Sequence, residues 1–186
     1  AGVNVSKVFG ELPDSMSEIL SVNQSDFFAC GISLVLHPKN PMAPTFHANL
    51  RYFELYKNNK LKDSWFGGGL DLTPYYIFDE DVVHFHESCK KVCDKYNEKF
   101  YQNYKKKCDE YFWNAHRNEA RGVGGLFFDY CRKNDKMTIE HWFSFIADLG
   151  NCFLESYCPI IEKRKDLIYN KDCLLYTSPS PRDQAK

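Results

Sequence analysis

The chain has 186 residues, enough for one domain with a sizeable core, and its 44% hydrophobic and 26% charged residues are typical of a globular protein. Its formal net charge of -1 provides no positive field for a polyanion, so we expect no nucleic-acid partner. No segment approaches the roughly 18 consecutive apolar residues of a membrane-spanning helix, so we expect no integral membrane association. The chain does not begin with Met or a recognisable leader, which suggests a fragment of a longer protein.

Eight cysteines occur without a C-x-x-C pair, in apolar or helical patterns. A chain of this length has no need of a disulfide framework, which favours reduced core cysteines and a reducing compartment.

The first part of the chain carries few chemical signals. Residues 1–30 predict a turn at Leu12–Ser15 and then a short helix or loop. The apolar run Ile32–Leu36 predicts one buried strand, and three prolines between residues 38 and 44 end it because proline cannot donate to a strand ladder.

The aromatic-rich segment Phe46–Tyr56 predicts a second strand. Because side chains alternate along a strand, each of the two strands has one apolar face and one polar face. The polar faces carry Ser33, Val35 and His37 on the first strand, and His47, Asn49 and Arg51 on the second. An ordinary solvated face is the alternative, but a His and an Arg four residues apart differ from the usual mixture of Lys, Glu and Thr.

A turn at Lys57–Lys60 predicts a hairpin, with Leu61–Asp71 as the antiparallel third strand. Three consecutive glycines at 67–69 weaken this strand and expose its backbone. A bulge or plain loop would explain them. The acid that follows directly, Asp71, favours the close approach of a ligand instead.

The second half of the chain is mainly helical. Asp79–His116 has a three- and four-residue apolar period, with Asp79 as the expected N-cap and a second helix near Phe100–Ala115. Thr138–Ile161 predicts a long amphipathic helix capped by Thr138. The apolar stripe expected on the second helix consists of Tyr104, Cys108, Tyr111 and Phe112.

Two motifs have competing interpretations. His86, Cys89 and Cys93 share a helical face near His84, but structural zinc sites usually take paired short spacings from two elements, so core packing is favoured. The glycines after Arg121 lack a G-K-[ST] motif and precede a strand, which argues against a phosphate loop. A glycine-rich strand entry with an arginine at its lip suits a flat ligand.

The polar candidates together indicate a kind of ligand. Arg51 and Arg121 can bind carboxylates bidentately, and Asp71 lies beside glycines and aromatic residues that leave room for a flat apolar body. A large flat ring with several carboxylates fits these needs. The chain has no Ser-His-Asp motif, and no flavin or nicotinamide fingerprint.

Several segments resemble the oxygen-dependent coproporphyrinogen III oxidase family. They are AGVNVS, HPKNPMAPTFHANLRYFE, WFGGGLDLTP, HFH…CD and CDEYF…HR.E.RGVGGLFFD, which cover roughly residues 1–170 in the family's order. The resemblance implies an α+β fold, a flat, mostly antiparallel sheet flanked by helices on both faces, incomplete here. It also implies oxidative decarboxylation of two propionates of coproporphyrinogen III to vinyl groups with O2, giving protoporphyrinogen IX, CO2 and H2O2. The family acts as a homodimer and requires no cofactor besides O2 as co-substrate.

The resemblance also implies roles for residues. His47 would be the proton donor, Asp71 would meet the pyrrole N–H groups under the macrocycle, and Arg121 would bind a carboxylate. The candidate catalytic residues are therefore His47, Asp71, Arg51 and Arg121. The candidate substrate-binding residues are Ser33, Asn49, Leu50, Arg51, Gly67, Gly68, Gly69, Asp71 and Arg121. Bacterial members are described with a divalent metal, which would be held here by His37, His47, His86 and His116.

The chain departs from the family at its end, which reads CLLYTSPSPRDQAK where the family continues with an arginine- and glycine-rich segment. We therefore expect residues 1–172 to form one truncated domain and residues 173–186 to be an artefactual, disordered tail. The fragment alone is expected to be inactive and poorly folded. The expected location is the cytoplasm, with the mitochondrial intermembrane space or a plastid as alternatives.

Two other functions remain possible: a non-catalytic tetrapyrrole-binding module, and a structural protein without a ligand. The presence of Asp71, His47 and both arginines favours the enzyme, because a mere binder could lose Asp71.

Overall fold

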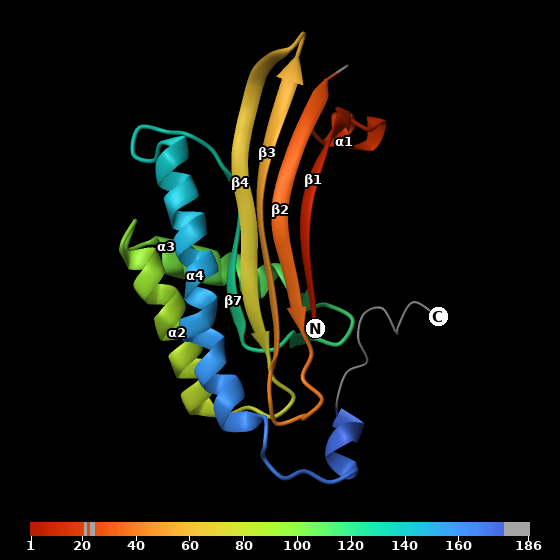
Figure 1. The fold of residues 1–186 in the computed structure, drawn as a ribbon, viewed down its shortest axis with the longest axis vertical. Helices are drawn as coiled ribbons and strands as arrows, with labels where there is room; N and C mark the ends of the chain where they lie inside the picture. The colour runs from red at the N-terminus through yellow and green to blue at the C-terminus, as the bar shows by residue number, and fades with distance from the viewer. Residues whose placement is uncertain (21, 23–24, 177–186) are drawn as a thin grey trace.

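The computed structural model describes residues 1–20, 22 and 25–176, which form an α+β fold around one antiparallel sheet (Figure 1). The elements in chain order are β1 (Gly2–Glu11), α1 (Asp14–Leu20), β2 (Asp26–Leu36), β3 (Thr45–Lys57), β4 (Lys60–Thr73), α2 (Asp79–Asp94), α3 (Phe100–Tyr111), β5 (Trp113–Asn114), β6 (Glu119–Ala120), β7 (Gly124–Cys131), α4 (Ile139–Arg164) and the 3-10 helix η1 (Asp172–Tyr176).

The main sheet has the strand order β1-β2-β3-β4-β7, and every neighbouring pair is antiparallel. Asn58 and Asn59 connect β3 to β4 with φ angles of 52° and 58°. Two successive residues of positive φ match the right-handed twist of a hairpin. The hairpin predicted at Lys57–Lys60 is confirmed.

The N-terminal region differs from the prediction. Gly2–Glu11 pairs along the whole of β2 as the strand β1, and β2 itself begins at Asp26 instead of Ile32. All ten residues of β1 are exposed. Its sequence alternates only over Val3–Ser6 before Lys7 interrupts the apolar positions, so the strand signal is short.

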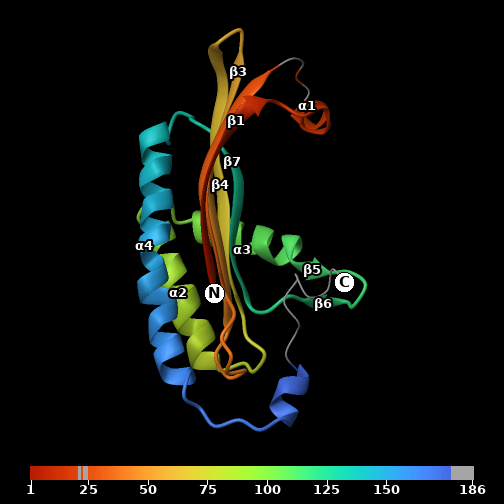
Figure 2. The same cartoon turned by 45° about the vertical axis from the view of Figure 1, so that its right-hand side comes forward.

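The core lies on one face of the sheet, under α2 and α4 (Figure 2). Phe46 and Leu72 of the sheet are completely buried, as is Phe145 of α4. The Tyr157 hydroxyl of α4 donates to the Pro44 carbonyl oxygen over 2.8 Å, which fixes the helix to the loop before β3. The face that carries His47 is therefore left without a covering helix pair.

Helix α3 crosses the β7 edge of the sheet. Tyr104 packs against Phe128 in the core, with ring centroids 5.3 Å apart. Tyr111, at the other end of the helix, stacks on Phe127 with centroids 4.2 Å apart. Because neighbouring strand residues point to opposite faces, α3 brings its last turn to the open face, where β5, β6 and α1 also lie (Figure 2).

The helix ends confirm one predicted cap and correct another. The Thr138 hydroxyl accepts from the backbone N–H of His141, as expected for the cap of α4. The N-cap of α2 is Phe78, without a side-chain hydrogen bond, and Asp79 is the first helical residue. An acid in this first turn still interacts favourably with the helix dipole.

The segment from Cys173 was expected to be disordered, but residues 173–176 belong to η1. The Cys173 backbone N–H donates to Asn170 Oδ1 over 3.1 Å, and the Tyr76 hydroxyl donates to the Cys173 carbonyl oxygen over 3.2 Å. The rest of the expected tail, residues 177–186, lies outside the described residues.

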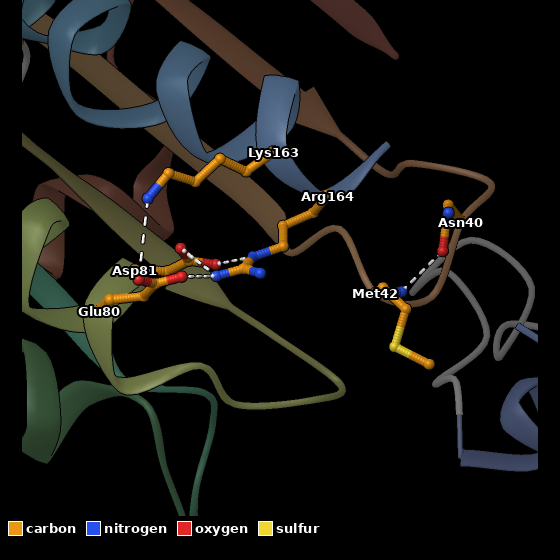
Figure 3. A network of polar contacts seen from close by, with 6 residues as sticks. All are labelled: Asn40, Met42, Glu80, Asp81, Lys163 and Arg164. Carbon is orange, nitrogen blue, oxygen red and sulfur yellow. Dashed lines mark hydrogen bonds and ion pairs between the residues drawn. The ribbon is translucent and has the colours of Figure 1, made fainter. Parts of the chain in front are cut away.

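A buried ionic network connects the end of α4 to the start of α2 (Figure 3). Arg164 donates from Nε to Asp81 Oδ2 over 2.8 Å and from Nη2 to Asp81 Oδ1 over 3.0 Å, and it also pairs with Glu80. The Arg164 and Asp81 side chains are 10% and 6% exposed. The Asn40 side chain donates to the carbonyl oxygens of Lys165 and Leu167, so the proline-containing loop is fastened to the same helix end.

Candidate active site

The open face of the sheet carries the predicted polar side chains in rows across the strands. His47 lies opposite Asp71, Asn49 opposite Gly69, and Arg51 opposite Gly67. The alternation predicted for the first and second strands is confirmed, because Ser33 and Val35 lie opposite Asn49 and His47 on the same surface.

A cleft of about 330 Å³ lies on this surface. It is lined by Ser33, Leu34, Val35, His47, Ala48, Asn49, Arg51, Gly68, Gly69, Asp71, Tyr111, Phe112, Arg121 and Phe127. A second depression of about 210 Å³ extends over β1 and β2 and shares Ser33, Asn49 and Arg51 with the first. The two together form a broad, shallow surface with polar side chains near its centre and aromatic rings at one side.

Asp71 lies at the base of the cleft and is 3% exposed. Its Oδ1 accepts from Arg121 Nη2 over 3.0 Å, and its Oδ2 accepts from the Thr73 hydroxyl over 3.1 Å. His47 Nδ1 is 3.1 Å from the same Oδ2. A buried carboxylate with three polar partners is held in one orientation, as a group that must meet a ligand requires.

Arg121 is held between Asp71 and an aromatic ring. Its guanidinium carbon lies 3.6 Å from the centroid of the Phe112 ring, a stacked cation–π arrangement. Its side chain is still 41% exposed. The arginine therefore presents part of its planar fork to the cleft while its orientation is fixed from below and from the side.

Arg51 makes an ion pair across the sheet with Asp129 of β7. Nη2 of Arg51 donates to Oδ2 of Asp129 over 2.6 Å. The pair lies above Gly67, where a Cβ atom would collide with Asp129 Oδ1 and lie 2.9 Å from Arg51 Nε. A side chain at position 67 would displace this pair, so Gly67 provides the space in which it forms.

The four histidines expected to bind a metal are only partly brought together. His37 and His47 lie close, with their Nε2 atoms 3.3 Å apart. His86 lies beside α3 instead, with Nε2 3.0 Å from the Val123 carbonyl oxygen and Nδ1 3.1 Å from the Tyr101 hydroxyl. His116 is exposed in the β5–β6 connection. Within residues 1–20, 22 and 25–176, no group of three or more His, Cys, Asp or Glu side chains could hold a metal ion, so the four-histidine set does not fit one.

The suggested zinc constellation on α2 is core packing, as favoured above. Cys89 and Cys93 are completely buried, and burial raises the pKa of the Cys89 thiol well above its usual value and that of Cys93 to about 12. Both thiols therefore stay protonated. Burial also lowers the pKa of His86, whose ring nitrogens bond to α3 and to the segment before β7.

Two candidate substrate-binding residues occupy positions whose side chains point away from the cleft. The Leu50 side chain is 8% exposed and packs in the core, and Gly68 lies opposite it in the ladder. Only the backbone of Gly68 borders the cleft. The side-chain period of a strand explains both placements, because positions 50 and 68 alternate with the site positions.

Other residues of the site were missed. Tyr111 and Phe112 were assigned to an apolar stripe, yet Tyr111 is 62% exposed and both line the cleft, because α3 ends at Tyr111 instead of continuing to Ala115. Thr73 and Asp129 also belong to the site, because Thr73 donates a hydrogen bond to Asp71 and Asp129 accepts one from Arg51. A Thr two residues after an acid on a strand was a usable signal for the first, since both share a face.

Comparisons with known proteins identify the family. A model of the family described as coproporphyrinogen III oxidase matches residues 1–177, which includes the start of the tail expected to lie outside it. The oxygen-dependent coproporphyrinogen-III oxidase of Francisella philomiragia subsp. philomiragia is 46% identical over 179 residues, which are 94% of this chain and 57% of that protein. The chloroplastic oxygen-dependent coproporphyrinogen-III oxidase of Glycine max is 49% identical, covering 91% of this chain and 46% of its own length. Coproporphyrinogen-III oxidase 1, chloroplastic, of Arabidopsis thaliana is 46% identical, covering 92% and 46%.

The chain spans about half the length of the curated relatives it matches. In the part of the chain that the structure describes, the helices are too short or too polar to cross a membrane. The matched family model extends over almost the whole sequence. The chain belongs to the coproporphyrinogen III oxidase family.

Proposed function

We propose that the protein to which this chain belongs oxidatively decarboxylates coproporphyrinogen III. The observation that carries the proposal is the placement of Asp71 between Arg121 and His47 on an open sheet face, with Arg51 on the same face. Each of two propionates loses CO2 and a hydride equivalent to become a vinyl group. O2 accepts these two electrons and, with one further proton, forms H2O2. The organic product is protoporphyrinogen IX.

The shape of the site supports a macrocyclic substrate. Gly69 leaves the β4 part of the cleft without a side chain, while Phe112 and Phe127 form an aromatic border. Ligand sites usually combine such apolar surface with a few placed polar groups. The two connected depressions together extend from β1 to β7, which suits a ring larger than a single aromatic group.

The charged groups support carboxylate and pyrrole recognition. Arg51 and Arg121 are 43% and 41% exposed, so each has N–H donors available for a propionate. A carboxylate has about four lone-pair sites, and the three contacts to Asp71 leave capacity for a pyrrole N–H. His47 Nδ1 lies 3.1 Å from Oδ2 of the same carboxylate, and this contact orients the ring of the proposed proton donor within the cleft.

The direct test uses the full-length protein with freshly reduced coproporphyrinogen III. Protoporphyrin fluorescence after autoxidation should develop only when the protein and O2 were both present, with CO2 and H2O2 as co-products. Tight binding without turnover would identify a non-catalytic tetrapyrrole-binding module and refute the proposal. Absence of both binding and turnover would favour a structural protein.

Further features belong to the proposal. O2 is the co-substrate, and no resident metal is used, so activity should survive exhaustive chelation. A homodimer is proposed for the full-length protein, supported by apolar side chains exposed on β1, including Val5 and Phe9 at 75% and 73%; light scattering would test it. The names of the chloroplastic relatives support a plastid location, which imaging of a full-length fluorescent fusion would test.

A further inference from the structure

We propose that Asp129 is a positioning residue that holds the guanidinium of Arg51 in place for a substrate carboxylate. The inference rests on the function proposed above and adds a residue that was not among the predicted site residues. It starts from an irregularity in the sheet. Phe66 pairs with Cys131 and Gly68 pairs with Phe128, so Gly67 of β4 faces two residues of β7, Asp129 and Tyr130.

This two-against-one arrangement is a β-bulge, a feature that re-aims side chains and is frequent beside active sites. Tyr130 has a φ angle of 54°, in the left-handed region that residues other than Gly, Asn and Asp rarely adopt. The bulge turns Asp129 and Tyr130 to the same open face, where Tyr130 packs on Trp65 with ring centroids 5.4 Å apart. A strained backbone conformation is therefore maintained where it directs Asp129 towards Arg51.

Both carboxylate oxygens of Asp129 are engaged. Oδ1 accepts from the backbone N–H of Tyr130 over 2.9 Å, and Oδ2 accepts from Arg51 Nη2 over 2.6 Å. The neighbouring strand β4 leaves space for this ion pair because its residue 67 is a glycine. The bulge, the glycine and the ion pair together hold the Arg51 guanidinium in one position.

The ion pair uses one nitrogen of the Arg51 fork, so the remaining N–H groups can meet an anion over the cleft. An arginine without this partner would sample many rotamers and would have to be ordered when a carboxylate binds. Asp129 lowers this entropic cost before the substrate binds. We therefore assign it a positioning role and do not regard it as a competitor of the substrate carboxylate for Arg51.

The test compares Asp129→Asn with Asp63→Asn in the full-length protein. Asp63 accepts two bonds from Arg132, at side-chain exposures of 33% and 42%, but neither residue lines the cleft, so this pair is the matched control. The probes are coproporphyrin III, which carries four propionates, and its tetramethyl ester, which carries none. Binding is followed by quenching of tryptophan fluorescence.

Asp129→Asn should weaken coproporphyrin III binding by about tenfold or more, the scale of one misplaced charge-assisted hydrogen bond, and leave ester binding unchanged. In turnover, the loss should appear mainly in KM and not in kcat. Asp63→Asn should change neither. Equal or tighter binding of coproporphyrin III to Asp129→Asn would overturn the inference.

Two further readouts separate the possible failures. If Asp129→Asn does not fold, as judged by circular dichroism, Gly67→Ala decides, because its methyl group displaces the same ion pair without removing a charge. It should cause the same selective loss, and unchanged binding would refute the positioning role. If the wild-type protein shows no turnover but Asp129→Asn selectively weakens carboxylate binding, the function proposed above fails while the positioning role stands.

Discussion

Replacing Asp71 with Asn tests the centre of the site, because it keeps the shape of the side chain and removes its charge. Arg121 can only donate, so the single amide oxygen must face it, and the NH2 group then faces His47. Nδ1 of His47 must become an acceptor, which moves the ring proton to Nε2. The variant thus loses one charge-assisted contact and imposes the wrong histidine tautomer.

The expected loss in kcat is about a hundredfold or more, the scale of removing one positioned group from an active site. The cost in folding stability should be smaller, about 1.5–3 kcal/mol for a hydrogen bond to a charged group, reduced because the Arg121 side chain is 41% exposed. Thr73→Val is the control, since it removes one contact to Asp71 and leaves the charge; we expect it to retain most of kcat.

The assay is conversion of coproporphyrinogen III by the full-length protein under air, with kcat and KM determined separately. A variant Asp71→Asn with near wild-type kcat and only a raised KM would refute the reasoning, because Asp71 would then contribute only ground-state binding.

Three more predictions concern the ionic network, the buried histidine and the second arginine. Arg164→Met leaves Asp81 buried without its partner and should lower the unfolding free energy by about 3–5 kcal/mol, measured as a shift of the denaturant midpoint; Arg164→Met combined with Asp81→Leu should recover much of it. Burial lowers the pKa of His86, so the folded state takes up this proton only at a pH below about 6.5, where the unfolded chain already carries it. Stability is therefore complete above that pH and declines as pH falls towards the lowered pKa, by at most about 1.4 kcal/mol per pH unit, and His86→Gln should flatten the decline in midpoints between about pH 7.5 and 5.5. Arg121→Lys loses both the planar fork and the stack on Phe112 and should reduce kcat/KM by about ten- to a hundredfold; an unchanged kcat/KM would show that the arginine does not contact substrate.

The sequence predicts those elements in which apolar and polar residues alternate with a clear period. The alternation in β3 identifies the face of His47, Asn49 and Arg51, because the opposite face is continuously apolar. In β1 the alternation extends only over Val3–Ser6 before Lys7 interrupts it, and the strand was missed. Helix ends were less predictable, as at Tyr111, because tertiary contacts and not local propensity decide where α3 stops.

The candidate site was predictable as a set of residues but not as a set of contacts. Which strands pair, and in which register, decides that His47 meets Asp71 and that Arg51 meets Asp129. A one-residue shift would turn every one of these side chains to the core. His86 was grouped with the site histidines by resemblance alone, and the packing of α2 against α3 places it elsewhere.

The order of the strands also has a kinetic consequence. β1 to β4 follow each other along the chain, so their pairings close short loops, whereas β7 reaches β4 only after α2 and α3 have intervened. Loop closure between distant segments is slow, so we expect the consecutive strands to assemble first and β7 to dock late. Arg121 immediately precedes β7, while Asp71 is in β4. The carboxylate therefore stays without its arginine until the last strand docks, which makes the site one of the final features that the chain acquires as it folds.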